Sequence, residues 1–328
     1  MSELKTAFVT GANGYVGSHV VRHLLAQGYA VTAMVRTNSN LDLLEGTSVT
    51  RVEIDLALPR QTGRLTKVLH GIDLIIHTAA YVDLGTVDRT LMKQVNLEGT
   101  RVLLEAAQSA GVPKFIYCST VRTLGDTAGA RVDGDHVRTD TDYASCYDET
   151  KTQAEALVLA RNRAGFSTYS VLPPGIFGRD EPHFGRALRA YLNGHLPFWP
   201  AQDRPLGMVH VEDLAELFFF VAHHGIPGTR YIASAGEATM GEIFGILGEM
   251  TGRKPPPDMP ESLVRAAAMV MDWIGSWTGR NMILNKERIV FLYDKVVRTD
   301  PTRSYSDLGW NPRKPREILA AILPKTED

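Results

Sequence analysis

Tyr147 and Lys151 are four residues apart, the spacing that places two side chains on one face of a helix. A phenol with an ordinary pKa of about 10 is a poor acid or base at neutral pH, and a neighbouring ammonium group favours the phenolate. The pair could therefore transfer a proton as a general acid/base. Because Tyr-x-x-x-Lys is common by chance, the motif indicates catalysis only if the neighbouring elements place suitable groups beside it.

Two hydroxyl side chains, Ser119 and Thr120, follow the apolar run at residues 115–117. If that run is a strand of a parallel sheet, both hydroxyl groups lie at its carboxyl end, where ligands bind. A hydroxyl there could donate a hydrogen bond to a substrate oxygen as negative charge develops on it. The alternative is that both groups only satisfy backbone groups at the strand end.

Three glycines stand between the apolar run at residues 7–9 and the helical pattern that follows it. A sharp strand-to-helix turn needs glycine where the backbone approaches a pyrophosphate and where the helix packs closely on the strand. The spacing is Gly-x-x-Gly-x-x-Gly rather than the commoner Gly-x-Gly-x-x-Gly, but its place between strand and helix predicts a dinucleotide site. The expected contacts in this turn are Gly11, Asn13, Gly14, Tyr15, Val16 and Gly17.

The residue that distinguishes the two nicotinamide dinucleotides is expected about 20 residues beyond the glycines, at the end of the second strand. An acid there would accept a hydrogen bond from the ribose 2′-hydroxyl and would repel a 2′-phosphate. This chain has Arg36, followed by Thr37, Asn38 and Ser39. A cation beside small hydrogen-bonding side chains suits a phosphate. The prediction is NADP(H), with NAD(H) less favoured and a merely solvated Arg36 as the alternative.

The elements that would position these residues are visible in the first half of the chain. Short apolar runs occur at residues 7–9, 31–35, 52–54, 74–76, 115–117 and 169–172. Helical patterns lie between them, such as the apolar face formed by Val16, Val20 and Leu24. This alternation predicts an α/β fold, a Rossmann-type doubly wound parallel sheet with helices on both faces.

The second half has a different character. Turn-rich segments at residues 196–200 and 255–257 separate helical stretches, which predicts a smaller, mostly helical substrate region at one end of the sheet. The expected dinucleotide-binding domain comprises residues 1–178 and about 205–235. The expected substrate-binding region comprises about 179–204 and 236–328.

Composition narrows the function classes. The chain has 35 Lys and Arg against 37 Asp and Glu, so bulk charge gives it no affinity for nucleic acid. Only Cys118 and Cys146 are present, which argues against a disulfide scaffold and indicates a reducing compartment. The first residues show no basic-then-apolar leader, and a cytoplasmic location is predicted. His77 and His210 lack partners at ligand spacing, so no metal is expected.

The most apolar long segment covers residues 263–277, but Arg265 and Asp272 interrupt it. A membrane-spanning helix needs about 18 uninterrupted apolar residues, so no membrane span is expected. The pattern predicts a core helix, with a position on a membrane surface as the alternative.

These parts, taken in order, resemble the extended short-chain dehydrogenase/reductase family over nearly the whole chain. The matching segments are the glycine turn, Asp55-Leu56, His77-Thr78-Ala79-Ala80, Asn96, Tyr147 with Lys151, residues 173–178 and residues 209–214. So many ordered matches are hard to obtain by accident.

The resemblance implies a role for each matching residue. Tyr147 would donate or accept the proton, Lys151 would lower its pKa and hold the nicotinamide ribose, and Thr120 would orient the substrate oxygen. Asn96 would brace the site. The further implied cofactor contacts are Asp55, Leu56, Thr78, Ala79, Ala80, Pro173, Gly175 and Ile176, with Tyr147 and Lys151.

Within the family, Val-Arg at the end of the second strand resembles the dihydroflavonol reductase and 3β-hydroxysteroid dehydrogenase branch. The main rivals are nucleotide-sugar epimerases and dehydratases. Those usually have Asn at the position of Gly175 and Arg at the position of Leu172, and both departures weaken the nucleotide-sugar interpretation.

The expected substrate pocket involves Tyr81, Val82, Ser119, Phe184 and Trp199, which are mostly apolar or aromatic. The predicted function is an NADP(H)-dependent oxidoreductase acting on a carbonyl or alcohol carbon of a mainly hydrophobic small molecule. One alternative is a nucleotide-sugar epimerase or dehydratase that oxidises its substrate transiently. Another is a non-catalytic NADP(H)-sensing protein. A homodimer is expected from the resemblance alone.

Overall fold

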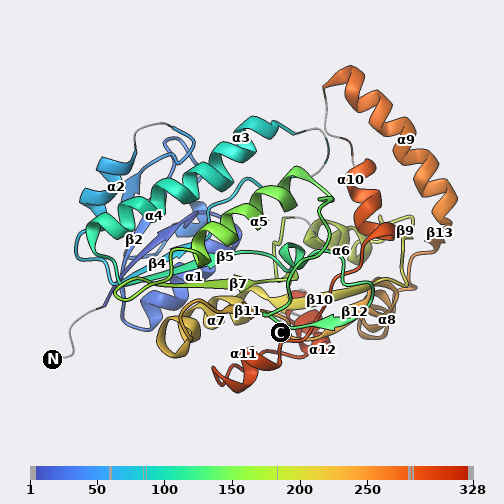
Figure 1. Cartoon of the computed structure of the whole chain (residues 1–328). Coiled ribbons are helices and arrows are strands. Elements are labelled where there is room, and N and C mark those ends of the chain that lie inside the picture. Colours follow the sequence, from blue (N-terminus) through green and yellow to red (C-terminus); the bar gives the residue numbers. More distant parts are fainter. Residues whose placement is uncertain are drawn as a thin grey trace.

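The computed structural model describes residues 5–58, 61–83, 85, 87–182, 184–279, 282 and 284–323. A seven-stranded sheet forms its centre, in the order β11-β7-β5-β4-β1-β2-β3 (Figure 1). The strands are β1 (Thr6–Thr10), β2 (Ala30–Val35), β3 (Thr50–Glu53), β4 (Leu74–His77), β5 (Lys114–Cys118), β7 (Ser167–Leu172) and β11 (Arg230–Ile232). Every neighbouring pair is parallel.

Helices cover both faces of this sheet, which is why its strands are apolar on both sides. One face packs on α1 (Tyr15–Ala26) and α7 (Val211–His224), and the other on α2 (Thr62–Leu69), α4 (Gly99–Ala110) and α5 (Cys146–Leu159). All four residues of β4 are buried. The predicted Rossmann-type doubly wound sheet is confirmed.

The strand order reverses at β1, because the chain goes from β1 outward to β2 and β3 and then returns to β4 on the other side. In such sheets the crevice at the carboxyl ends of the two central strands is the usual ligand site. The glycine turn follows β1, and residues 78–80 follow β4. Both predicted cofactor segments therefore meet at the switch point.

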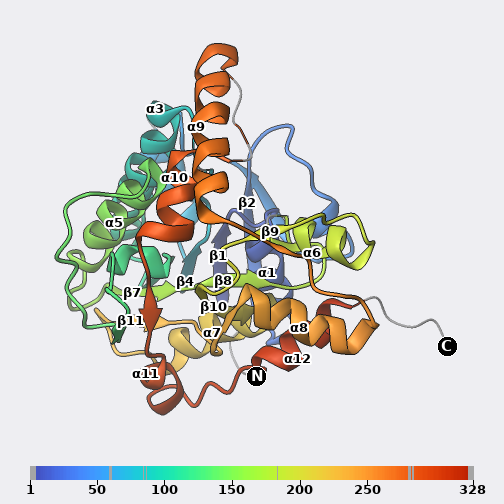
Figure 2. The same ribbon diagram turned by 90° about the vertical axis from the view of Figure 1, so that its right-hand side faces the viewer.

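A second region packs at one end of the sheet around its own core, which includes Phe177, Met208, Phe244, Leu247 and Ile318 (Figure 2). Its sheet has the order β12-β10-β8. Its main elements are β8 (Gly175–Phe177), α6 (Phe184–Leu192), β9 (Trp199–Pro200), β10 (Pro205–His210), β12 (Glu237–Thr239), α8 (Met240–Thr251), β13 (Asp258–Met259), α9 (Glu261–Thr278), α10 (Lys286–Ile289) and α12 (Pro315–Ile322). The domain boundaries given above stay a prediction.

Short elements connect these parts. They are η1 (Asp42–Leu44), α3 (Arg89–Lys93), the π-helical turn η2 (Gln94–Glu98), the 3-10 turn η3 (Val121–Leu124), β6 (Arg131–Val132), the π-helical turn η4 (Val290–Asp294), β14 (Arg298–Thr299) and α11 (Thr302–Ser306). Two of them, η3 and η4, reach the site described below.

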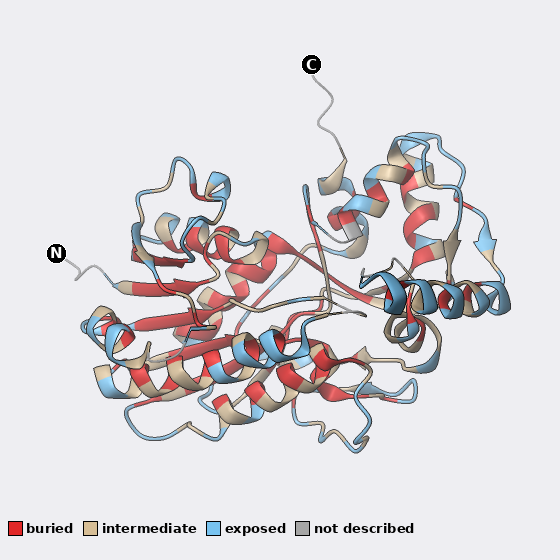
Figure 3. Cartoon of the chain, turned by 90° about the horizontal axis from the view of Figure 1, so that it is seen from above, coloured by how far each residue is buried: buried red, intermediate tan, exposed pale blue. Residues whose placement is uncertain are grey.

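The helix α9 differs from the expectation of a core helix. Only Val264, Ala268 and Gly275 are buried along its length, whereas Trp273 and Trp277 are 66% and 84% exposed. Figure 3 shows it as a largely exposed helix at one end of the molecule. The core prediction was wrong because a one-sided apolar pattern does not say whether its apolar side is covered. Within the described ranges, no helix is long and apolar enough to cross a bilayer.

Candidate active site

The glycine turn is so tight that side chains would not fit at two of its positions. Gly11 has φ +64°, and a Cβ atom on it would lie 2.8 Å from the backbone of Ala79. A Cβ on Gly17 would lie 2.1 Å from the carbonyl oxygen of Gly11. These approaches hold α1 close to β1 and to the segment after β4.

The N-terminus of α1 is suited to an anion. Gly14 is its N-cap residue, no side chain caps the helix in the described structure, and its first turn carries no acid. The first backbone N–H groups of a helix lack partners within the helix, and the helix dipole places partial positive charge there. A pyrophosphate fits this end of α1, as the fold implies for a nicotinamide dinucleotide.

The segment after β4 lies directly against the glycine turn. Thr78 donates through Oγ1 to the carbonyl oxygen of Thr10 at 2.7 Å, and the Ala79 N–H donates to Oγ1 of Thr10 at 3.2 Å. Thr78, Ala79 and Ala80 are all partly buried. The predicted contacts Gly11, Gly17, Thr78 and Ala79 thus share one wall of the crevice.

The predicted adenosine end lies along β2 and β3. Arg36 is exposed directly after β2, and Thr37 donates to Oε2 of Glu53 at 3.1 Å. Asn13 ties the glycine turn to this edge by donating to the carbonyl oxygen of Asn40 at 3.0 Å. Sequence reasoning did not foresee Glu53, an exposed acid beside the predicted phosphate position.

Asp55 and Leu56 follow β3 as predicted. Asp55 accepts the N–H of Ala57 at 2.9 Å, which shapes the turn. Leu56 is buried, and its Cβ lies 2.9 Å from where a Cβ on Gly99 would stand. Leu56 therefore packs against the start of α4 as well as bordering the expected adenine position.

Asn96 joins two parts of the site. It is 1% exposed within η2, where it accepts the Tyr81 N–H at 2.7 Å and donates to the Tyr81 carbonyl oxygen at 3.0 Å. Its amide also donates to Oγ1 of Thr150 in α5 at 3.1 Å. Asn96 thus braces the loop after β4 against α5. Single-turn π-helices such as η2 occur often at functional sites.

His77 continues this network. Its Nδ1 lies 2.6 Å from Oγ1 of Thr10 and its Nε2 2.9 Å from Oγ1 of Thr100, which donates to the carbonyl oxygen of Asn96 at 2.7 Å. Burial, helped by the charge of Lys151, lowers the pKa of His77 to about 3, so the ring stays neutral. His77 is a satisfied core residue.

Tyr147 and Lys151 lie one turn apart in the first half of α5, which Ser145 caps by accepting the Asp148 N–H at 3.1 Å. Lys151 is 2% exposed. Its ammonium group donates to the carbonyl oxygen of Cys118 at 2.6 Å and lies 4.1 Å above the Tyr117 ring. Both residues of the predicted pair thus come from α5, and Lys151 reaches the end of β5.

Electrostatics around this pair differ from the expectation that Lys151 lowers the pKa of Tyr147. Burial raises the pKa of Tyr147 well above its usual value, and the charge that opposes this is that of Arg122. Burial also lowers the pKa of Lys151 to about 8. At neutral pH Tyr147 is therefore protonated and is poised as an acid.

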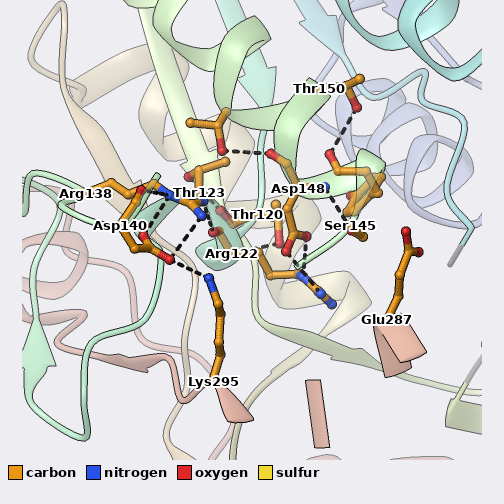
Figure 4. Close-up of polar contacts among 12 residues, drawn as sticks. Thr120, Arg122, Thr123, Arg138, Asp140, Ser145, Asp148, Thr150, Glu287 and Lys295 are labelled. Carbon is orange, nitrogen blue, oxygen red and sulfur yellow. Dashed lines mark hydrogen bonds and ion pairs between the residues drawn. The ribbon is translucent and has the colours of Figure 1, made fainter. Parts of the chain in front are cut away.

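Thr120 lies where β5 ends and η3 begins, and it is 7% exposed. Its Oγ1 accepts the N–H of Arg122 at 3.4 Å. Arg122 donates from Nε to Oδ1 of Asp148 at 2.6 Å, and its guanidinium group lies over the ring of Phe291. Figure 4 shows Thr120, Arg122 and Asp148 pointing toward one another.

A cavity of about 260 Å³ opens beside this group. Thr120, Asp148, Gly175 and Trp199 line it, whereas Tyr81, Val82 and Tyr147 are not among its lining residues. Sequence reasoning missed a mainly apolar set of its lining residues, comprising Leu206, Met240, Phe291, Leu292, Val296 and Val297. The side chain of Phe184 lies outside the described part of the structure.

Cations also line the cavity, and carboxylates neutralise most of them. Arg138 pairs with Asp140 at 2.8 Å, and Lys295 pairs with the same carboxylate at 2.7 Å. Arg204 donates to the carbonyl oxygen of Tyr293 at 2.9 Å. The cavity lining is therefore mainly apolar, and the cations in it are paired with carboxylates or bound to a carbonyl oxygen.

The remaining predicted residues lie at the ends of β5 and β7 and in β8. Pro173 is buried and accepts the Val121 N–H at 3.1 Å through its carbonyl oxygen. Gly175 and Ile176 belong to β8, which pairs with β10. Ser119 is 3% exposed, and no partner for its Oγ is found among the described residues. Ser119 is thus buried and is not among the residues that line the cavity.

Comparison with known proteins agrees with this geometry. The family described as NAD dependent epimerase/dehydratase matches residues 7–233. Sterol demethylase protein B of Methylococcus capsulatus is 30% identical over 329 residues, covering 96% of each chain. A 3-beta-hydroxysteroid dehydrogenase of Mycolicibacterium neoaurum is 31% identical and covers 100% of this chain and 93% of its own. A putative dihydroflavonol 4-reductase of Synechocystis is 31% identical, covering 95% and 92%.

Solved structures share the fold. The crystal structure of gox2253 superposes with a TM-score of 0.81 at 27% identity, covering 97% of this chain and 96% of that one. MoeE5 in complex with UDP-glucuronic acid and NAD has a TM-score of 0.74 at 22% identity, covering 97% of both chains. The chain belongs to the NAD-dependent epimerase/dehydratase family and is an extended short-chain dehydrogenase/reductase enzyme that uses a nicotinamide cofactor.

Proposed function

We propose that the protein is an NADP(H)-dependent oxidoreductase that reduces a carbonyl group of a mainly hydrophobic small molecule, or oxidises the corresponding alcohol. The observation that carries this proposal is the cavity at the end of β5, which Thr120 lines together with a mainly apolar set of side chains. Apolar walls with few polar groups suit a lipophilic ketone better than a sugar diphosphate.

The names of the relatives support the same substrate class. Two of them are named for sterol or steroid chemistry, and a third, from Stigmatella aurantiaca, is named as a ketoreductase of a farnesylated quinoline oxide. Gly175 and Leu172 replace the Asn and Arg that nucleotide-sugar enzymes usually carry at these positions. We therefore favour the reductase over the epimerase.

The chain's own residues would act as follows. Thr120 donates a hydrogen bond from its hydroxyl group to the substrate oxygen and orients the carbonyl group. Tyr147 transfers a proton from its Oη to that oxygen as the carbonyl carbon is reduced. Lys151, anchored on Cys118, stands where it can contact the ribose and stabilise the phenolate that remains. The bound nicotinamide supplies the hydride.

The protonation state of Tyr147 favours the reductive direction. Because its raised pKa keeps the phenol protonated at neutral pH, the resting enzyme holds the proton that carbonyl reduction consumes. Asn96 and Thr150 would keep α5 in place through their hydrogen bond while the proton moves.

The test is a panel of aldehydes and lipophilic ketones supplied with NADPH. A reductase consumes the nucleotide in proportion to product, whereas an epimerase converts a sugar nucleotide with no net consumption. Tyr147→Phe should lower kcat by about 10²–10⁴-fold with nucleotide binding retained. Tyr143→Phe is the matched control, because Tyr143 is 38% exposed and its ring stacks on Arg138. Full activity of Tyr147→Phe would refute the assignment.

A further inference from the structure

The exposed side of α9 carries no charge. From residue 262 to the end of this 18-residue helix, the exposed side chains are apolar or hydroxylic. They belong to Ser262, Leu263, Ala266, Met269, Val270, Trp273, Ile274, Ser276, Trp277 and Thr278. A helix in contact with water alone normally presents charged residues on its outer side.

The charged side chains of α9 all have ion-pair or hydrogen-bond partners. Glu261 pairs with Arg265 at 2.7 Å, and Arg265 also binds Asp294. Asp272 accepts the N–H of Lys286 at 2.8 Å. Exposed charges of both signs lie near the helix: Lys286 at its flank, and Arg253, Lys254 and Asp258 in the segment that leads into it. The apolar side is therefore bordered by mixed charge, and what sets it apart is its apolar and aromatic side chains.

The apolar side is large and regular. Leu263, Met269, Val270 and the two tryptophans are each more than half exposed. Together with Ile274 they present on the order of 600 Å² of apolar surface, at the upper end of what monomers expose. The Trp273 and Trp277 rings stack with their centroids 6.2 Å apart. Tryptophan favours the layer between hydrocarbon and water.

We propose that α9 docks this face onto the surface of a lipid bilayer, lying in the headgroup layer with its two tryptophans inserted. The helix is about 27 Å long, which is enough to lie along a membrane. It extends past its neighbours at one end of the molecule, where a flat surface can reach it (Figures 1 and 2).

A bilayer fits this face better than a second copy of the chain does. A dimer through α9 would join two convex helix edges, and at about 600 Å² from each copy it would bury at most about 1,200 Å², the lower limit of specific interfaces. A bilayer surface instead takes up the full length of the helix, with the tryptophan rings in the layer that they favour.

The docked helix would stand next to the substrate cavity. Its buried side packs through Val264 and Ala268 against Ile289 of α10. α10 continues into η4, whose Phe291 and Leu292 line the cavity at Thr120. This last step rests on the proposed function, because only a lipophilic substrate would gain by entering from the bilayer.

The test is flotation of the full-length protein with vesicles of phosphatidylcholine, alone and with one quarter phosphatidylglycerol. We expect the wild-type protein to float with both to a similar extent. Trp273→Gln/Trp277→Gln should weaken binding at least tenfold with both, and Lys286→Gln, which changes only a charge at the flank, should float like the wild type. The matched control is Val137→Ser/Ile226→Ser, which removes two exposed apolar side chains outside α9 and should float like the wild type.

Three results would overturn the proposal. One is a wild-type protein that does not float, and another is a double tryptophan variant that floats equally well. The third is a dimer in analytical ultracentrifugation, without vesicles, that the double variant dissociates, because the face would then belong to a second copy. Turnover of a short water-soluble ketone is measured on the same samples. Flotation without turnover refutes only the proposed function, and turnover without flotation refutes only the docking.

Discussion

Arg122 donates from Nε to Oδ1 of Asp148 at 2.6 Å and from Nη2 to Oδ2 at 3.3 Å, so the two side chains form a two-point ion pair. Their side chains are 15% and 5% exposed. Arg122 belongs to η3, which follows Thr120, and Asp148 follows Tyr147 in α5. One buried pair thus fixes the two segments that carry the proposed hydroxyl and phenol groups.

Breaking this pair should cost more stability than breaking an exposed one. Arg122→Met leaves the Asp148 carboxylate buried without its partner, and we expect a loss of about 3 kcal/mol in the free energy of unfolding. The double variant Arg122→Met/Asp148→Asn should recover much of that loss. The measurement is denaturant unfolding followed by circular dichroism.

The control is Arg316→Met, which breaks a pair with Glu249 whose side chains are 60% and 65% exposed. Exposed pairs contribute about 0–1 kcal/mol, so this variant should unfold nearly like the wild type. An Arg122→Met protein as stable as Arg316→Met would show that the buried pair does not hold these segments.

The glycine turn gives a second prediction. Gly17→Ala would place a Cβ atom 2.1 Å from the carbonyl oxygen of Gly11, so α1 must shift away from β1. We expect at least a tenfold loss of affinity for NADPH, measured by quenching of protein fluorescence. The matched control is Gly63→Ala in α2, where nothing lies within 4 Å of the new Cβ. That variant should bind normally and gain up to about 1 kcal/mol of stability.

Local patterns were enough to predict the parallel sheet and the place of the glycine turn between β1 and α1. The glycine turn and the Tyr147–Lys151 spacing each depend on a few neighbouring residues. Between a strand and a helix, such short patterns are enough to predict the local backbone conformation. Thr120 could be placed because it directly follows an apolar strand. These features agree with the structure because none of them needs a distant partner.

The rest of the site depends on contacts between distant segments. Phe291 covers Arg122 across 169 positions of sequence, and no local pattern couples the two. The cation that opposes the raised pKa of Tyr147 is likewise Arg122 rather than the expected Lys151. The exposure of α9 was missed for a similar reason, since periodicity shows an apolar side but not what covers it.

The dinucleotide preference can be tested at two side chains of opposite charge. If Arg36 binds the 2′-phosphate, Arg36→Asp should lower kcat/KM for NADPH at least tenfold and raise the relative use of NADH. Glu53, which accepts a hydrogen bond from Thr37, should oppose the phosphate, so Glu53→Gln should shift the ratio toward NADPH. Arg64→Asp changes an exposed arginine on α2 and should leave the ratio unchanged. An unchanged ratio of NADPH to NADH use in Arg36→Asp would mean that another residue binds the 2′-phosphate.

Burial of Lys151 makes the cofactor-free protein's stability depend on pH. Its pKa is about 8 in the folded state and 10.5 when exposed, so between these values the unfolded chain holds a proton that the folded protein has lost. Stability therefore rises with pH across this window, and the burial cost is fully present only below pH 8. A shift of this size corresponds to about 3 kcal/mol.

Lys151→Met removes the titrating group. The stability of the wild type minus that of this variant should increase by about 3 kcal/mol between pH 8 and pH 10.5, measured by urea unfolding without nucleotide. Lys67→Met removes an exposed lysine on α2, and its difference from the wild type should stay flat. Because Lys151 lies one turn after Tyr147 in α5 and is proposed to hold the nicotinamide ribose, its replacement should also abolish turnover. A difference that does not change with pH would show that the ammonium group is solvated in the folded protein.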